Sequence, residues 1–291
     1  ISYQEFQELL DNYSFYQDDL VGDEVGIPLY FLGKKTKNSK IKVVQVGEGA
    51  DELFYGYDHW NRYLKLNKFF KPFFKSTKKY SSFKNHRLNM LSNILFNRTS
   101  FAGGALGFNL KELDSLIEDG LPNHSDLIFY ADNKWKDYFS NKNSKISKWM
   151  TLIDLKIRLP ELLLMRMDKL VMQSAVEARV PFLDHKLVEY VLSLPEELLI
   201  DLTNTKSLLK KVALKYLPDQ IINRKKQGFR APIGEWIKKD EEKFYESVQQ
   251  FNSLVNLFNE RELNHILNGN DYQKKWYLIN LSNWHLARVA N

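Results

Sequence analysis

Cysteine is absent from the 291-residue chain. This absence excludes disulfides, thiolate nucleophiles and cysteine-ligated zinc, but it leaves the cellular compartment open. The six histidines never reach H-x-x-x-H or H-E-x-x-H spacing, so a histidine-rich metal site is not expected. No apolar run approaches the roughly 18 residues of a membrane span, and the N-terminal stretch lacks the basic segment of a signal peptide. We expect a soluble cytoplasmic protein without a membrane partner.

The positive charge of the chain is modest. Lysine and arginine total 42 against 36 acids, which favours anionic ligands but does not by itself indicate nucleic-acid binding. Lysines alternate with aromatics between Lys65 and Arg87, a combination found in proteins that bind single strands. An amphipathic helix with a solvated lysine face, followed by a polar loop, explains the pattern better. A basic helical module that binds nucleic acid therefore stays as the non-enzymatic alternative, and nucleic acid is not the expected partner.

Helical patterning dominates the chain. Apolar residues recur at three- and four-residue spacing in segments 3–10, 27–35, 88–96, 152–159, 186–194, 207–217 and 274–289. Only Ile41–Val46, "IKVVQV", predicts a strand, and its near-continuous apolar run is typical of a buried parallel strand. The expected fold class is α/β, predominantly helical with few strands. We expect one domain over residues 1–291, with its earlier strands upstream of Ile1.

A short acidic turn follows the predicted strand. Gly47 and Gly49 allow a tight turn and close approach to a ligand, and the helix expected over Ala50 to Phe54 has free N–H groups for an anion. Three acids in the same turn, Glu48, Asp51 and Glu52, would repel a phosphate unless a divalent cation lay between them. The alternative is an ordinary acidic helix start. Spacing alone does not decide between the two.

Two further segments carry possible chemistry. In "RMDKLVMQSAVEARVPFLDH", Arg166–His185, a structural interpretation is favoured: Glu177 and Arg179 form a paired strut, and the apolar residues after the proline enter the core. In "NRKKQGFRAPIGEWI", Asn223–Ile237, four cations surround a glycine ahead of a proline that suits a helix start. A solvated basic loop is the simpler explanation on charge alone, and a lysine aimed at a phosphate is the functional one.

Taken together, "GEGADELFYGY", "MRMDK…EARVPFLD" and "RKKQGFRAPIGEW" resemble, in order and separation, the synthetase domain of asparagine synthetases. The resemblance covers roughly Ile27 to Ile237. It implies an adenine-nucleotide alpha-hydrolase-like (ATP pyrophosphatase) fold and the ATP-dependent amidation of aspartate, or a similar carboxylate, to asparagine. The carboxylate would pass through an acyl-adenylate, with AMP and pyrophosphate released. A β-lactam synthetase-like cyclase and an amidotransferase for a cell-surface precursor are the alternatives within the same superfamily.

The resemblance also implies site residues. Val46 and Gly47 would contact the ATP or AMP, and Glu48 would act on the acyl-adenylate and the incoming ammonia. Asp51 would help to hold Mg²⁺, and Lys226 would meet the α-phosphate. Two positions depart from the family pattern. Val46 replaces the usual serine, which matters little for a backbone contact, and Tyr55 replaces a small residue and would narrow the pocket.

Parts of the family pattern are missing. The pyrophosphate loop S-G-G-x-D-S does not occur, because "AGGALG" at Ala102–Gly107 comes too late and lacks the aspartate and the serine. The glutaminase domain that would deliver ammonia is also missing. We therefore expect the C-terminal portion of a longer enzyme, inactive alone. The apolar edge of its strand would invite association, with a homodimer as one possible assembly.

Overall fold

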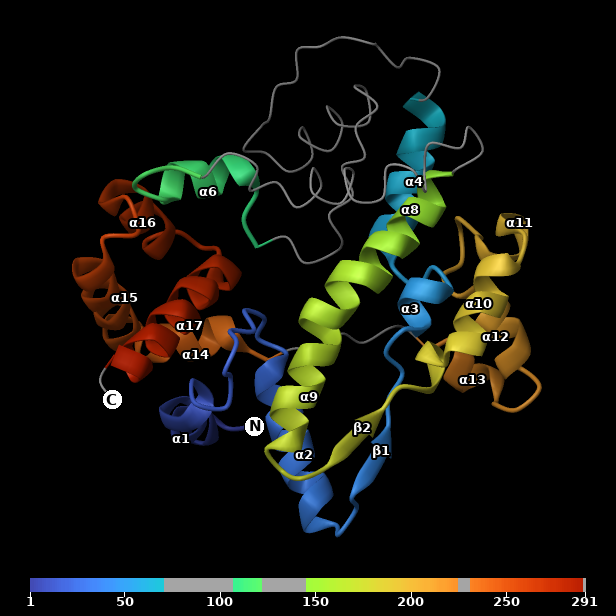
Figure 1. The fold of residues 1–291 in the computed structure, drawn as a ribbon, viewed down its shortest axis with the longest axis horizontal. Coiled ribbons are helices and arrows are strands. Elements are labelled where there is room, and N and C mark those ends of the chain that lie inside the picture. The colour runs from blue at the N-terminus through green and yellow to red at the C-terminus, as the bar shows by residue number, and fades with distance from the viewer. Residues whose placement is uncertain (71–106, 122–144, 225–230, 290–291) are drawn as a thin grey trace.

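The computed structural model describes residues 1–70, 107–121, 145–224 and 231–289. Helices dominate these ranges, and the sheet found among them has two strands. A long helical rod stands in the middle of Figure 1, with helices grouped on both sides and the two strands beside its lower end. The prediction of a mostly helical chain with few strands is confirmed. Within the same ranges, no helix combines the length and the apolar character needed to cross a bilayer.

The N-terminal region supplies two helices. Helix α1 (Tyr3–Tyr13) starts with a capping box, in which the Ser2 hydroxyl accepts from the Glu5 N–H and the Glu5 carboxylate accepts from the Ser2 N–H. Helix α2 (Gly26–Asn38) follows a loop and packs along the lower part of the rod. Both agree with the apolar periodicity predicted for residues 3–10 and 27–35.

The sheet corrects one expectation about the strand, namely its burial. Strand β1 (Val43–Gln45) pairs in parallel with β2 (Glu177–Arg179), so its partner lies within the chain, in the segment interpreted as a strut. Strand β1 is also not buried, since Val43 is 41% exposed. Successive side chains of a strand point to opposite faces, and only the face with Val44 packs on a core. The strut itself is confirmed, with Arg179 Nε 2.8 Å from Glu177 Oε1.

The rod consists of three helical segments without a break: α8 (Ile146–Ile153), the π-helix η2 (Asp154–Leu164) and α9 (Met165–Met172). Pro160 lies within η2 and cannot donate a backbone hydrogen bond, which disfavours ordinary α-helical geometry at this point. Wide π turns occur frequently at functional sites. The rod supplies two of the arginines in the site described below.

A second group of helices lies to the right of the rod in Figure 1, except for α4 (Asp58–Phe70), which lies at the upper end of the rod beside α8. They are α3 (Ala50–Leu53), α4, the 3₁₀ turn η3 (Pro181–Leu183), α10 (His185–Ser193), α11 (Glu196–Leu199), α12 (Ser207–Ala213) and α13 (Asp219–Ile222). The helix predicted over 207–217 is therefore shorter than expected. The prediction over 186–194 is confirmed apart from its last residue, and segment 88–96 lies outside the described residues.

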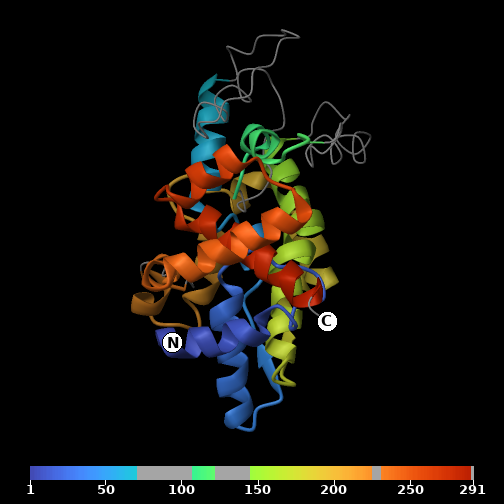
Figure 2. The ribbon, with the colours of Figure 1, turned by 90° about the vertical axis from the view of Figure 1, so that its left-hand side faces the viewer.

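The remaining helices lie on the other side, and Figure 2 shows the C-terminal ones in front of the rod. They are α6 (Leu110–Leu116), α14 (Ile233–Lys239), α15 (Glu241–Val255), α16 (Glu260–Leu267) and α17 (Tyr272–Val289). Helix α17 contacts α14, α15 and α16. It confirms the helix predicted over 274–289.

Two hydrophobic clusters form the core, and the acidic turn runs from one to the other. The first cluster joins α1, α2, α9 and the C-terminal helices, with the rings of Phe6 and Trp236 stacked at 4.4 Å. The second gathers around Trp60 and includes Leu53 of α3. Val46, just before the turn, packs on the first cluster, whereas Leu53, just after it, is buried in the second. The turn is thus anchored at both ends.

Candidate active site

The backbone turns sharply between β1 and α3. Gly49 has φ of +90°, and any Cβ there would overlap the side chain of Leu183, so this position requires glycine. Gly47, in contrast, has no described atom within 4 Å of where a Cβ would lie, which leaves its backbone open to close approach. The N–H of Val46 donates to the Arg179 carbonyl at 2.9 Å and is therefore occupied by the sheet. The predicted strand, glycine turn and helix are all present.

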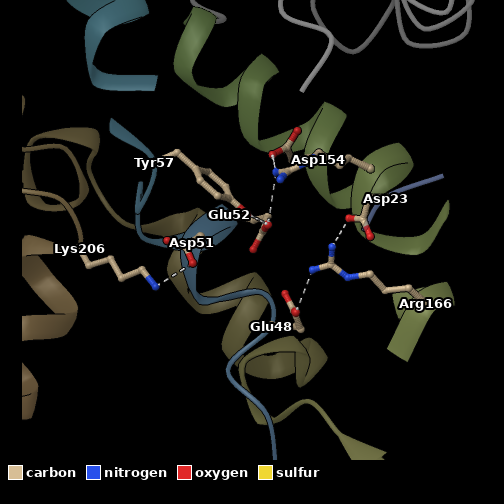
Figure 3. Close-up of polar contacts among 9 residues, drawn as sticks. Asp23, Glu48, Asp51, Glu52, Tyr57, Asp154, Arg166 and Lys206 are labelled. Atoms are coloured by element: carbon tan, nitrogen blue, oxygen red, sulfur yellow. Dashed lines mark hydrogen bonds and ion pairs between the residues drawn. The ribbon is translucent and has the colours of Figure 1, made fainter. Parts of the chain in front are cut away.

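Each of the three acids in the turn faces a different cation from a distant segment. The nitrogen–oxygen distances are 3.6 Å for Glu48–Arg166, 3.0 Å for Asp51–Lys206 and 3.9 Å for Glu52–Arg158. The cations come from α9, the residue before α12, and η2. Figure 3 shows Lys206 and Arg166 approaching the turn from opposite sides. Each acid of the turn thus has a cation of its own within ion-pair distance.

Two of these cations also contact a second carboxylate. Arg166 forms an ion pair with Asp23, and Arg158 lies 2.9 Å from Asp154. In this group the carboxylates outnumber the cations by two. The surplus negative charge favours the approach of a cation, including one that accompanies a phosphate.

Glu48 combines partial burial with an arginine nearby. Its side chain is 25% exposed. Burial raises the pKa of its carboxyl above the usual glutamate range, Arg166 opposes this increase, and the neighbouring acids Glu52 and Asp51 add to it. A carboxyl with a raised pKa accepts a proton more readily near neutral pH than an ordinary glutamate does. Glu48 is therefore a candidate general base.

Asp51 lies against a lysine held in an uncommon conformation. Lys206 has φ of +56°, and its ammonium group lies 3.0 Å from Asp51 Oδ2. A Cβ on Gly56 would overlap both Asp51 Oδ1 and Lys206 Cε, so the pair depends on that glycine. The Asp51 side chain is 22% exposed.

Asp51 provides a limited fit for the predicted magnesium. Within the described residues, no group of three or more histidine or acidic side chains is arranged to hold a metal ion. Mg²⁺ is commonly bound through one or two carboxylates, with substrate phosphates and water completing its coordination. The residues present therefore fit a magnesium ion that arrives with a phosphate ligand, and they do not form a metal site made of protein alone.

Glu52 belongs to a buried network that fixes α3 to the rod. Its side chain is 1% exposed, and Oε1 accepts a 2.5 Å hydrogen bond from the Tyr57 hydroxyl. Burial raises the pKa of Tyr57, with Glu52 contributing, and burial raises the pKa of Asp154 to about 6 in spite of Arg158. Oε2 of Glu52 and Oδ1 of Asp154 have no hydrogen-bond partner in the described part of the chain. The network is internal, so we assign it a structural role.

Part of the predicted site lies outside the described residues. Lys226 lies outside the described residues, as does the basic stretch from position 71 to Arg87. The helix expected after the proline of the basic loop is confirmed, since Pro232 caps α14. Tyr55 is buried, and its ring packs edge-on against Trp60 at 5.4 Å, so its bulk fills the second cluster.

Sequence reasoning missed most of the cations of the site. Arg166 lies in one of the three motifs, but the sequence gives it no specific role, and it does not single out Arg158 or Lys206. Arg158 and Asp154 have the i, i+4 spacing of a helical ion pair, a signal that the sequence does contain. Lys206 has no comparable local signal, because its contact depends on a positive φ and on the distant Gly56.

A parallel strand pair, a glycine turn open to a ligand and a carboxyl with a raised pKa beside an arginine together define an α/β protein with a candidate nucleotide site. Residues 1–286 match the family model described as asparagine synthase. The chain therefore belongs to the asparagine synthase family, which confirms the resemblance seen in its three motifs.

Curated relatives agree with this assignment. The chain is 30% identical to asparagine synthetase (glutamine-hydrolyzing) 1 of Bacillus subtilis strain 168 over 258 residues, 86% of the chain and 40% of that relative. A Mycobacterium bovis protein whose name likewise contains asparagine synthetase is 30% identical over 311 aligned positions, 100% of the chain and 46% of the relative. The chain thus spans less than half the length of these relatives.

Proposed function

We propose that the chain is the synthetase part of an enzyme that converts aspartate to asparagine with ATP, through an acyl-adenylate. Family membership supports the reaction class, and the names of the relatives support asparagine as the product and glutamine as the source of ammonia. The fold proposed with it is the adenine-nucleotide alpha-hydrolase-like fold, of which the parallel pair β1–β2 would be a part.

In the proposed reaction, a carboxylate oxygen of aspartate attacks the α-phosphorus of ATP, and pyrophosphate leaves. Ammonia then attacks the acyl carbon, and AMP leaves with the oxygen that formed the anhydride. Gly47 would allow the nucleotide to approach the backbone, since the space beside it is open. Lys226 would stabilise the charge that gathers on the α-phosphate oxygens during the first step. Asp51 would contribute one carboxylate to a Mg²⁺ bound together with the polyphosphate.

The environment of the Glu48 carboxyl is the observation that carries the proposal. It lies in the turn between the two core clusters, partly exposed, with a pKa raised by burial and a cation at 3.6 Å. These properties suit the removal of a proton from the attacking ammonium, a role that typically accelerates a reaction about 10²–10⁴-fold.

The test uses the protein at its natural length, supplied with ATP, Mg²⁺, aspartate and ammonia. Asparagine and pyrophosphate are measured together. We expect equal amounts of both from the wild type, and at least about 10²-fold less asparagine from Glu48→Gln. Glu112→Gln, which removes an ion-paired glutamate far from the turn, serves as the matched control and should keep normal turnover.

The same assay separates the alternatives. A β-lactam synthetase-like enzyme would release pyrophosphate only with a substrate that carries its own amine, and a cell-surface amidotransferase would need a different carboxylate. Failure of the natural-length protein to release pyrophosphate with aspartate would contradict the proposed substrate. Normal turnover of a folded Glu48→Gln variant would contradict the role given to Glu48.

A further inference from the structure

A series of charged groups leads from the loop before α2 to Glu48. Asp23, in that loop, forms an ion pair with Nη1 of Arg166 on α9, and Nη2 of Arg166 lies 3.6 Å from Glu48 Oε1. Figure 3 shows the guanidinium between the two carboxylates. The exposed fractions of the side chains are 15% for Asp23, 11% for Arg166 and 25% for Glu48. Three separate elements therefore bring their charges together in a partly buried place.

The two acids share Arg166 unequally. Asp23 accepts a hydrogen bond from the guanidinium, whereas 3.6 Å to Glu48 is too long for one. Nε of Arg166 and Oδ1 of Asp23 are buried without a hydrogen-bond partner among the described residues. The closer contact belongs to Asp23, which therefore orients the guanidinium and offsets part of its charge.

We propose that Asp23 and Arg166 are positioning residues for Glu48, and that Asp23 limits how strongly the guanidinium holds Glu48 in its ionised form. The inference rests on the proposed function, in which Glu48 accepts a proton. An arginine that acted on Glu48 alone would hold the pKa of its carboxyl lower and make it a weaker base, whereas loss of the arginine would leave the effect of burial on that pKa unopposed. Because Arg166 is shared with Asp23, the proton affinity of the Glu48 carboxyl lies between these two limits.

The charges around Glu48 support this balance. Besides burial, Glu52 and Asp51 in the same turn both raise its pKa, and Arg166 lowers it. The arginine is thus the group through which the proton affinity of Glu48 can be reduced. A change at Asp23 should reach Glu48 through that arginine.

The test measures the pKa of Glu48 in the natural-length protein by ¹³C NMR of labelled glutamate carboxyls, assigned with Glu48→Gln. Arg166→Gln should raise the pKa of Glu48 by about one unit or more, because an opposite charge within a few ångströms typically shifts a pKa by 1–3 units. Asp23→Asn should shift it in the opposite direction, because the guanidinium then acts on Glu48 alone. The acid limb of the kcat/KM profile should move in the same two directions.

A double variant decides whether Arg166 transmits the effect. In the Arg166→Gln background, the shift caused by Asp23→Asn should largely disappear. A shift of equal size in both backgrounds, or no shift with Asp23→Asn in the wild type, would overturn the inference. Lys274→Gln, which breaks a distant ion pair with Glu112, should leave the Glu48 pKa unchanged.

The NMR measurement also distinguishes this inference from the proposed function. The protein could form no asparagine while the pKa of Glu48 shifts in the expected directions. That result would contradict the proposed function and support the positioning role of Asp23 and Arg166. If asparagine forms but Asp23→Asn leaves the pKa of Glu48 unchanged, the positioning role is contradicted and the proposed function is retained. Should Arg166→Gln fail to fold, an unchanged or raised Glu48 pKa in Asp23→Asn would still overturn the inference.

Discussion

The ammonium group of Lys206 lies 3.0 Å from the Asp51 carboxylate, and it reaches this position from a residue with φ of +56°. A positive φ costs a non-glycine residue roughly 1–3 kcal/mol, and such strain clusters at functional sites. Gly56 leaves the space in which the two side chains meet. The pair therefore places a cation beside the carboxylate to which we assign the polyphosphate-bound metal.

Lys206→Met should weaken the binding of ATP and pyrophosphate by about 10-fold or more and leave AMP binding unchanged. A charge-assisted hydrogen bond is worth roughly 1.5–3 kcal/mol, and AMP lacks the phosphates that would reach this lysine. Calorimetric titrations of the three ligands provide the comparison. Lys210→Met, which removes a lysine of α12 that bonds Asn204, should bind all three normally. Equal losses for AMP and ATP would place Lys206 away from the polyphosphate.

Gly56→Ala should destabilise the protein, whereas Gly47→Ala should not. An alanine at position 56 would overlap Asp51 and Lys206, and overpacking of this kind typically costs about 1–3 kcal/mol. At position 47, no described atom stands in the way of the methyl group. Urea unfolding of the two variants gives the free energies. Similar stabilities would show that the Asp51–Lys206 contact contributes little to the fold.

Asp154→Asn should make stability less dependent on pH between about 4 and 7. Burial raises the pKa of Asp154 to about 6, while an unfolded aspartate titrates near 4. The folded protein binds the Asp154 proton more tightly than the unfolded chain does. The stabilisation that results is therefore fully present below about pH 4 and is lost as the pH rises through about 6. The difference amounts to about 1–3 kcal/mol in the wild type and should vanish in the variant. Urea unfolding at several pH values tests this, with the exposed Asp271→Asn as control.

Lys226→Ala should slow adenylation about 10²–10³-fold, judged from the loss of comparable electrostatic donors. Lys225→Ala should do much less, since we expect that lysine to be solvated. Single-turnover formation of pyrophosphate separates adenylation from the later amidation step. If the two variants lose the same activity, the loop acts as diffuse positive charge and Lys226 has no specific role.

The helices were predictable because their apolar periodicity reflects the cores that they cover. The strand after residue 40 was also predictable, but its exposure was not. "IKVVQV" is apolar on both faces, and only the structure shows that Val43 faces outward while Val44 meets the core. Strand β2 was missed because three residues containing an acid and an arginine have no clear β pattern.

For the site, the acids were visible in one short motif and their partners were not. The turn contains Glu48, Asp51 and Glu52 within five residues. The two arginines and Lys206 that form ion pairs with them come from segments more than a hundred residues away. Such pairings follow from the packing of the rod and α12 around the turn. No local sequence pattern predicts that packing.

Adenylation of the substrate carboxylate is the central step of the proposed reaction, and an isotope measurement tests it. The natural-length protein is given aspartate labelled with ¹⁸O in the side-chain carboxyl, together with ATP, Mg²⁺ and ammonia. Attack of that carboxylate on the α-phosphorus leaves one labelled oxygen in AMP for each asparagine formed, which mass spectrometry detects. We predict labelled AMP and unlabelled pyrophosphate. Label in inorganic phosphate or in pyrophosphate, with unlabelled AMP, would contradict the proposed acyl-adenylate.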